Sequence, residues 1–88
     1  MYTKEIVILN EVGLHAMPAT YFTQKANSYK SNIQIQREEK SVNAKSLLGV
    51  LSLCVNRGAT ISITAEGSDE EEAVQGLIDF ISSDFNEN

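Results

Sequence analysis

The residues best suited to chemistry lie in the segment 13–19, Gly-Leu-His-Ala-Met-Pro-Ala, which holds the single histidine of the chain. Its glycine lets the backbone turn sharply. Pro18 suits the first turn of a helix, where its missing N–H group would have no intrahelical partner. The free N–H groups of Ala16 and Met17 would then point toward whatever His15 holds. Because a helix N-terminus attracts anions, the segment predicts a histidine that handles a negatively charged group.

The position of His15 at a helix start favours one kind of chemistry. The positive end of the helix disfavours the imidazolium ion, so we expect a mostly neutral ring that can act as a nucleophile at about pH 7. A phosphoryl group on a ring nitrogen is a labile phosphoramidate, which suits transfer rather than storage. Position alone leaves one alternative, an exposed histidine that caps the helix and does no chemistry.

Ser46 precedes a second predicted helix and invites a similar analysis. As an N-cap, its hydroxyl would satisfy one backbone N–H group and contribute about 1 kcal/mol to stability. A phosphate on this hydroxyl would place negative charge at a helix N-terminus, where it is tolerated. Because a serine phosphate ester is stable, it would act as a signal rather than as a carrier. Position alone favours the simple cap.

Hydrophobic periodicity and turn residues predict the elements that must position these two residues. Alternating or β-rich segments predict four strands, over residues 2–9, over 32–37, from the break at 38–39 through Val42, and over 60–65. Apolar residues at helical spacing predict three helices, over residues 16–28, over 47–53, and from Glu70 onward. Residues 56–58, Asn-Arg-Gly, predict a turn.

The last of these helices has an acidic first turn, which suits the positive end of the macrodipole. Gly76 inside it costs about 1 kcal/mol relative to Ala, and the sequence leaves open whether close packing compensates. Its predicted apolar stripe consists of Ala73, Val74, Leu77, Ile78, Ile81 and Phe85. Strands with one polar face then predict an α+β open-faced sandwich. Its four-stranded antiparallel sheet would be covered on one face by three helices, in a single domain over residues 1–88.

The composition argues against several classes of protein. Eighty-eight residues suffice for one domain, and a hydrophobic fraction of 42% argues against disorder. Seven basic against twelve acidic residues, a net charge of -5, is the wrong balance for a nucleic-acid binder. No run approaches about 18 apolar residues, so we expect no membrane insertion. One cysteine and one histidine cannot supply a zinc ligand set, so we expect no metal, and no motif predicts a cofactor.

Cys54 lies between Leu53 and Val55 in an apolar run, which predicts a buried, reduced thiol. A single cysteine cannot form an internal disulfide, and the first residues carry no secretory signal. We therefore expect a soluble protein of the reducing cytoplasm, and we expect it to be a monomer.

Three segments carry a resemblance to a known family. They are residues 13–19, residues 42–49, Val-Asn-Ala-Lys-Ser-Leu-Leu-Gly, and residues 65–73, Ala-Glu-Gly-Ser-Asp-Glu-Glu-Glu-Ala. At these spacings they closely resemble HPr, the phosphocarrier of the bacterial phosphoenolpyruvate:sugar phosphotransferase system. The similarity covers essentially the whole chain. It favours chemistry at His15 and modification of Ser46 over the two simple caps.

The resemblance implies a set of partners. His15 would accept phosphate on Nδ1 from phosphorylated enzyme I and pass it to a sugar-specific enzyme IIA. The segment 43–49 is similar to the Gram-positive form, in which HPr kinase/phosphorylase modifies the serine that matches Ser46. The modified form would act with a catabolite-control transcription factor in carbon catabolite repression.

The resemblance also implies a docking surface for these partners beside the histidine. Its candidate residues are Met17, Thr20, Leu47, Leu48 and Leu51. Leucines beside a reactive residue form a patch that successive partners can share. For Leu51 the alternative is a place in the core, although Val50 and Leu53 are better core candidates.

Met17 is the one serious departure from the family pattern, which normally has Arg at this position. A guanidinium there helps to hold the phosphate and meets acidic groups of the partner. Hydrogen bonds to charged groups contribute about 1.5 to 3 kcal/mol, so the loss would slow transfer by at most roughly 10- to 150-fold. Lys45 could replace part of the missing charge if the fold brings it close.

Two functions therefore remain open. The first is a phosphohistidine carrier, with His15 as nucleophile and the Ala16 and Met17 amides as anion holders. It would carry a covalent intermediate and need partners for turnover, so it would not be a stand-alone enzyme. The second is an HPr-like regulatory protein that acts mainly through Ser46, with weak or no histidine transfer. Met17 favours the second, and the retained His15 favours the first.

Overall fold

The computed structural model describes residues 1–85; the last part of the predicted domain, residues 86–88, lies outside the described residues. The chain forms β1 (Tyr2–Val7), α1 (Ala16–Asn27), β2 (Asn32–Arg37), β3 (Lys40–Asn43), α2 (Leu47–Ser52), β4 (Thr60–Glu66) and α3 (Glu70–Ser82). Every predicted element is present and of the predicted type. Within residues 1–85, no helix has the length and apolar character needed to cross a membrane.

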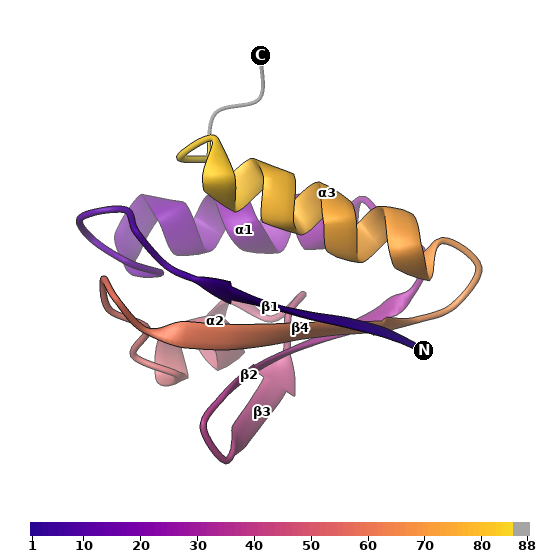
Figure 1. Cartoon of the computed structure of the whole chain (residues 1–88), viewed down its shortest axis with the longest axis horizontal. Coiled ribbons are helices and arrows are strands. Elements are labelled where there is room, and N and C mark those ends of the chain that lie inside the picture. The colour runs from indigo at the N-terminus through magenta and orange to yellow at the C-terminus, as the bar shows by residue number, and fades with distance from the viewer. Residues whose placement is uncertain (86–88) are drawn as a thin grey trace.

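The four strands form one sheet in the order β1-β4-β2-β3, and all neighbouring strands are antiparallel. Helices α1 and α3 lie side by side over one face of the sheet (Figure 1), and α2 packs against α1 and β3. The opposite face carries polar pairs such as Thr3 with Thr64, whose hydroxyls are 2.9 Å apart. The fold is therefore the predicted α+β open-faced sandwich.

The alternation of apolar and polar residues explains which face of the sheet the helices cover. In β2 and β4 each second side chain is buried, namely Ile33, Ile35, Ile61, Ile63 and Ala65. Phe22 from α1, Val50 from α2 and Leu77 from α3 join them in one core cluster. All three helices thus bury apolar side chains against the same face, and the other face stays in water.

The predicted first strand is two residues too long. Ile8 is fully buried, but it leaves the β1 ladder and exchanges backbone hydrogen bonds with the loop before β4. Its N–H group donates to Ala59 O at 2.9 Å, and its carbonyl accepts from Gly58 N at 2.7 Å. Leu9 is 72% exposed, so β-rich composition continues past the end of the strand.

The predicted apolar stripe of α3 needs three corrections. Phe80, which the prediction omitted, is buried, whereas Ile78 is only half-buried. Phe85 is buried as predicted but lies beyond the helix, which ends at Ser82. Its ring packs edge-on against Phe80, with centroids 5.5 Å apart. The chain therefore folds back over the helix end, which helical periodicity cannot predict.

Gly76 is required by close packing. A Cβ atom built on Gly76 would lie 1.9 Å from the hydroxyl oxygen of Tyr29, the residue that follows the end of α1. No side chain could occupy this place without moving the tyrosine ring. The helix accepts the propensity cost of a glycine of about 1 kcal/mol because α1 and α3 approach closely here.

Cys54 is exposed, so the prediction of a buried thiol is wrong. Helix α2 ends at Ser52, and Cys54 then adopts a left-handed backbone with φ of 53° while its N–H group donates to Leu51 O. The two neighbours of Cys54, Leu53 and Val55, are both buried. The turn at the helix end thus directs the middle residue of an apolar run into solvent.

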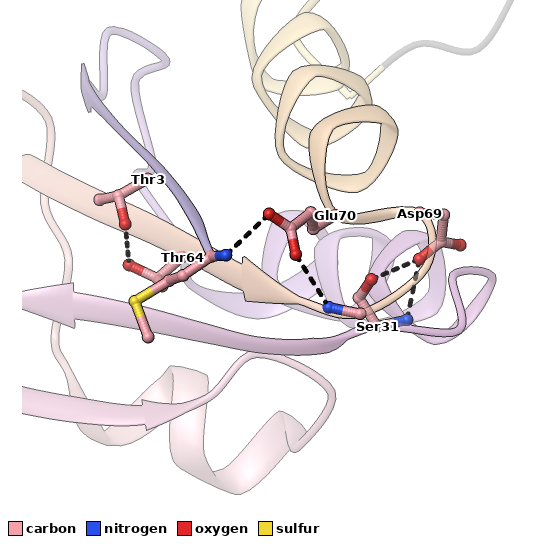
Figure 2. A network of polar contacts seen from close by, with 7 residues as sticks. Thr3, Ser31, Thr64, Asp69 and Glu70 are labelled. Atoms are coloured by element: carbon pink, nitrogen blue, oxygen red, sulfur yellow. Dashed lines mark hydrogen bonds and ion pairs between the residues drawn. The ribbon is translucent and has the colours of Figure 1, made fainter.

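A polar network joins the turn between α1 and β2 to the start of α3 (Figure 2). The Asp69 carboxylate accepts hydrogen bonds from Lys30 N, from Ser31 N and from the Ser31 hydroxyl, which is buried. These bonds, led by the one from the Ser31 hydroxyl, lower the pKa of Asp69 to about 2. Beside it, Glu70 pairs with the terminal ammonium of Met1 at 2.8 Å, and this contact lowers the pKa of Glu70.

Candidate functional site

His15 lies directly before α1 on an extended backbone, with φ of -124° and ψ of 158°. Its ring is half-buried and makes no capping hydrogen bond to the helix. His15 therefore occupies the N-cap position of α1, but its side chain does not satisfy a backbone N–H group there. The ring lies at a helix N-terminus and is reachable from solvent, as the chemical hypothesis requires.

Asn56, from the loop before β4, contacts the His15 ring through its side chain. The distance between His15 Nε2 and Asn56 Oδ1 is 2.9 Å, a good hydrogen bond between residues 41 positions apart. The sequence predicts a turn at residues 56–58 but no role for Asn56. No local signal could have found it, because only the tertiary fold brings the two loops together.

Gly13 and Leu14 fasten the histidine loop to the segment that carries Asn56. Leu14 N donates to Val55 O at 2.9 Å, and both residues are fully buried. Gly13 has φ of 64°, and a Cβ there would lie 2.1 Å from Val55 O. Only glycine combines this left-handed backbone with such a close approach. The glycine predicted to turn the chain therefore also seats His15 against its partner loop.

The first turn of α1 has an unusual start. Ala16 has φ of 53°, a left-handed backbone that costs a residue with a Cβ roughly 1 to 2 kcal/mol. Ala16 and Met17 are both exposed, and the first N–H groups of a helix have no intrahelical acceptor. The strained residue Ala16 thus follows His15 directly and lies at the helix start, where the sequence predicts that an anion binds.

Ser46 is the N-cap of α2, as predicted. Its Oγ accepts a hydrogen bond from Gly49 N at 3.1 Å, and the residue is half-buried. It lies at the opposite end of α1 from His15, because Asn27 at the end of that helix donates to Lys45 O at 3.1 Å. Helix α1 has 12 residues, so the two candidate phosphorylation sites are roughly 18 Å apart along it.

Lys45 does not replace the charge that Met17 lacks. Its ammonium donates to Tyr29 O at 2.8 Å, beyond the far end of α1. A basic residue in the loop that contacts the ring is Arg57, which is exposed and directly follows Asn56. Sequence order could not reveal this exchange, because Lys45 lies closer to His15 along the chain than Arg57 does.

The predicted docking residues lie on α1 and α2, which pack against each other. Leu48 and Met17 are 81% and 52% exposed, Leu47 is less so, and Thr20 and Leu51 are half-buried. Leu51 packs partly against the core, so its two alternatives are both partly right. Helix α2 starts near the end of α1 and leads back toward the His15 loop. Leu47 and Leu48, in its first turn, therefore lie nearer to Ser46 than to His15.

Two further apolar side chains, Val12 and Tyr21, are 54% and 40% exposed, and the sequence did not predict this exposure. With Pro18 they line a shallow depression of about 330 Å³.

In the part of the chain that the structure describes, no group of three or more His, Cys, Asp or Glu side chains is placed to hold a metal ion.

Comparisons with known proteins all give one family. The family model described as "PTS HPr component phosphorylation site" matches residues 2–83. The HPr-like protein Crh of Halalkalibacterium halodurans is 44% identical over 81 residues, 92% of this chain and 96% of that protein. A structure of HPr-C-His from Thermoanaerobacter tengcongensis is 45% identical with a TM-score of 0.95, covering 100% of this chain and 99% of that one. The phosphocarrier protein HPr of Bacillus anthracis is 42% identical with a TM-score of 0.88, covering 90% and 94%.

Proposed function

Since the chain belongs to the HPr family of the phosphotransferase system, we propose that it carries phosphoryl groups in sugar uptake. It accepts a phosphoryl group on His15 from phosphorylated enzyme I and donates it to an enzyme IIA. The observation that carries this proposal is the half-buried, solvent-reachable ring of His15 at the N-terminus of α1. We propose that the protein acts in the cytoplasm.

The proposed transfer follows from this placement. A ring nitrogen of His15 gives its lone pair to phosphorus, and the bond between phosphorus and the donor breaks with its electron pair returning to the donor. The exposed Ala16 and Met17 N–H groups hold the phosphoryl oxygens, and the positive end of α1 stabilises their charge. Donation to enzyme IIA reverses these steps. No general base is required, because the attacking nitrogen carries no proton.

The test is incubation with phosphoenolpyruvate and a cognate enzyme I. We expect one phosphoryl group per chain, on His15, labile in acid and stable in base, as a phosphoramidate is. The His15→Ala variant is the control and should remain unmodified. An unmodified wild-type chain after long incubation with active enzyme I would exclude the carrier function.

Partner docking by Met17, Thr20, Leu47, Leu48 and Leu51 belongs to the same proposal. The exposure of Leu48 and Met17 and the packing of α1 on α2 support a continuous surface along both helices. Apolar side chains that water reaches are the usual anchors of shared docking sites. Leu48→Ala should therefore weaken binding to enzyme I without changing the free energy of unfolding.

Ser46 is the second proposed site, a regulatory one modified by HPr kinase/phosphorylase. Its N-cap geometry supports this role, because a phosphate on Oγ would lie at the positive end of α2, where added negative charge is tolerated. Incubation with ATP and the kinase should label the wild-type chain and leave Ser46→Ala unlabelled. Labelling that persists in Ser46→Ala would place the modification on another residue.

The alternative function is a regulatory protein that acts mainly through Ser46 and a catabolite-control transcription factor. Two observations favour it: the similarity to the HPr-like protein Crh, and Met17 in the first turn of α1. The retained His15, with its half-buried but solvent-reachable ring, favours transfer. The two functions are separated by the transfer step itself, since a purely regulatory chain would take up phosphate at Ser46 and pass none from His15 to enzyme IIA.

A further inference from the structure

We infer that Asn56 is a positioning residue that holds the His15 ring in the tautomer with the proton on Nε2 and the lone pair on Nδ1. The inference deepens the proposed phosphotransfer and rests on it for its functional part, whereas the tautomer itself is a property of the unmodified protein. The observation that carries it is the bond of 2.9 Å between His15 Nε2 and Asn56 Oδ1.

The chemistry of the amide fixes the direction of this hydrogen bond. A side-chain carbonyl oxygen has no hydrogen and can only accept, so the imidazole Nε2 must donate. In a neutral ring the proton on Nε2 leaves Nδ1 unprotonated. The opposite tautomer would place two lone pairs against each other at 2.9 Å. Asn56 therefore selects Nδ1 as the nucleophile.

The backbone around Asn56 is held independently of its side chain. Asn56 O accepts a hydrogen bond from Ala59 N at 3.0 Å, in a turn where Gly58 has φ of 92°. On the other side, Leu14 N donates to Val55 O at 2.9 Å, and the close approach of Gly13 fixes the distance between the two loops. The amide thus reaches the ring from a fixed position, and it need not be ordered when the partner binds.

The same bond becomes stronger during transfer. When the Nδ1 lone pair forms the bond to phosphorus, the donor's bond to phosphorus breaks and its electron pair leaves with the donor. The Nε2 proton stays on the ring, which now carries a positive charge shared between both nitrogens. A hydrogen bond from a charged donor is about twice as strong as a neutral one. Because this charge develops while the new bond forms, Asn56 stabilises the transition state more than the free ring, and this raises the rate of phosphorylation.

The test uses the full-length chain labelled with ¹⁵N, above the pH at which the ring loses its proton. Long-range ¹H–¹⁵N correlation should give the Nε2–H tautomer for the wild type. In Asn56→Ala the ratio of the two tautomers should fall by about two- to tenfold, the value of one neutral hydrogen bond. Asn56→Asp retains an acceptor that cannot donate and should keep the wild-type tautomer. Asn32→Ala, at an exposed asparagine in β2, is the matched control.

The functional readout is the rate of His15 phosphorylation by phosphorylated enzyme I at saturation. We expect it to fall by about two- to tenfold in Asn56→Ala and to stay unchanged in Asn32→Ala. Because the Asn56 side chain is exposed and its backbone makes the turn, the variant should keep the dispersed amide spectrum of the folded chain.

Several results would overturn the inference: an Nδ1–H tautomer in the wild type, an unchanged tautomer ratio in Asn56→Ala, or a changed ratio with an unchanged rate. Failure of the proposed function is recognised separately. In that case the wild type shows the Nε2–H tautomer, which needs no enzyme I, but forms no phosphohistidine.

Discussion

At the scale of the residue, what distinguishes His15 is what surrounds it. The imidazole meets a carbonyl oxygen from another loop, the free N–H groups of a helix start and a strained Ala16, with an exposed apolar side chain where a cation would help. In the proposed transfer, the carbonyl oxygen would act on the tautomer, the N–H groups on the oxygens of the phosphoryl group, and the exposed side chain on the charge that partners meet.

The first prediction concerns Met17. Met17→Arg should raise the rate of His15 phosphorylation by at most about tenfold, since a guanidinium can donate to a phosphoryl oxygen but is screened by water at a position that is 52% exposed. Rapid-quench kinetics with phosphorylated enzyme I measure it. Met17→Gln introduces a polar side chain without a charge and should change the rate of phosphorylation little. An unchanged rate in Met17→Arg would mean that another group already supplies the charge.

Arg57 is the group that the structure suggests for that role, and it forms the second prediction. Arg57→Gln should lower the rate of phosphorylation by about two- to fivefold, the effect of one exposed charge on the loop that contacts the ring. Lys45→Gln removes the same charge at the far end of α1, where Lys45 binds Tyr29 O, and is the matched control. If Arg57→Gln and Lys45→Gln lower the rate equally, Arg57 acts only through the net charge of the protein and not through its position. Raising the salt concentration should shrink the Arg57 effect.

The sequence predicted the residues of this site better than their relations. The positions of His15 and Ser46 before helix starts are a local pattern that the sequence predicts, whereas their chemical roles rest on the family resemblance and stay proposals. Asn56 was missed and the place of Lys45 was left open because both questions depend on contacts between residues distant in sequence. Local patterns predict where a helix begins but not which loop packs against that end.

At the scale of the element, the contact between α1 and α3 depends on Gly76. Gly76→Ala should lower the free energy of unfolding by up to about 2 kcal/mol, because overpacking costs about 1 to 3 kcal/mol and alanine returns only about 1 in helix propensity. Urea unfolding measures it. Tyr29→Phe removes the hydroxyl oxygen that lies 1.9 Å from the added Cβ, so the same substitution should cost less in that background. Equal costs in both backgrounds would contradict the assigned contact.

The end of α2 gives the opposite prediction. Cys54 holds a left-handed backbone with φ of 53°, which glycine adopts without the strain that a Cβ adds. Cys54→Gly should therefore raise the free energy of unfolding by about 1 kcal/mol, measured by urea unfolding. Cys54→Ala keeps the Cβ and should change it by less. The exposed thiol should also react rapidly with a thiol reagent in the folded protein, as a buried one would not.

Elements were predictable to the extent that their patterns are local. The alternation in β4 and the helical spacing in α3 identified both elements, and the errors lie at their ends and in the segments that follow. Ile8 remains buried after its strand ends, and Phe85 remains buried after its helix ends. In each case the chain leaves the regular hydrogen bonds of its element but continues along the core. Side chains therefore stay buried beyond the residues whose periodic pattern predicts the element.

At the scale of the whole molecule, the fold places the two candidate phosphorylation sites at opposite ends of α1. His15 lies at the first end, bound to the loop before β4, and Ser46 lies beyond the second, where Asn27 binds the start of α2. With both sites on one helix and its packed neighbour, a single partner surface that spans α1 and α2 would meet both. A phosphate at Ser46 would then act on docking rather than on the chemistry of His15.

The turn that closes α1 is tied to α3 by the Asp69 carboxylate, and this tie makes the whole fold sensitive to acid. Its hydrogen bonds with Ser31 and Lys30 lower the pKa of Asp69 in the folded state to about 2, against about 4 for an unfolded chain. Between these values the unfolded state binds more protons, so stability falls as the pH falls. The contribution is complete above about pH 4 and lost near about pH 2.

Asp69→Asn should therefore be less stable than the wild type at neutral pH, and the gap should narrow steadily as the pH falls from about 4 to about 2. The narrowing follows because the amide has no proton to gain, whereas the carboxylate loses its charge and its bonds to Ser31 and Lys30. Urea midpoints measured across this range test it, with Glu71→Gln, an exposed acid in the first turn of α3, as the control. Parallel curves for Asp69→Asn and the wild type would show that the bonds seen in the fold are not held by charge, and the link between α1 and α3 would then rest on the apolar core.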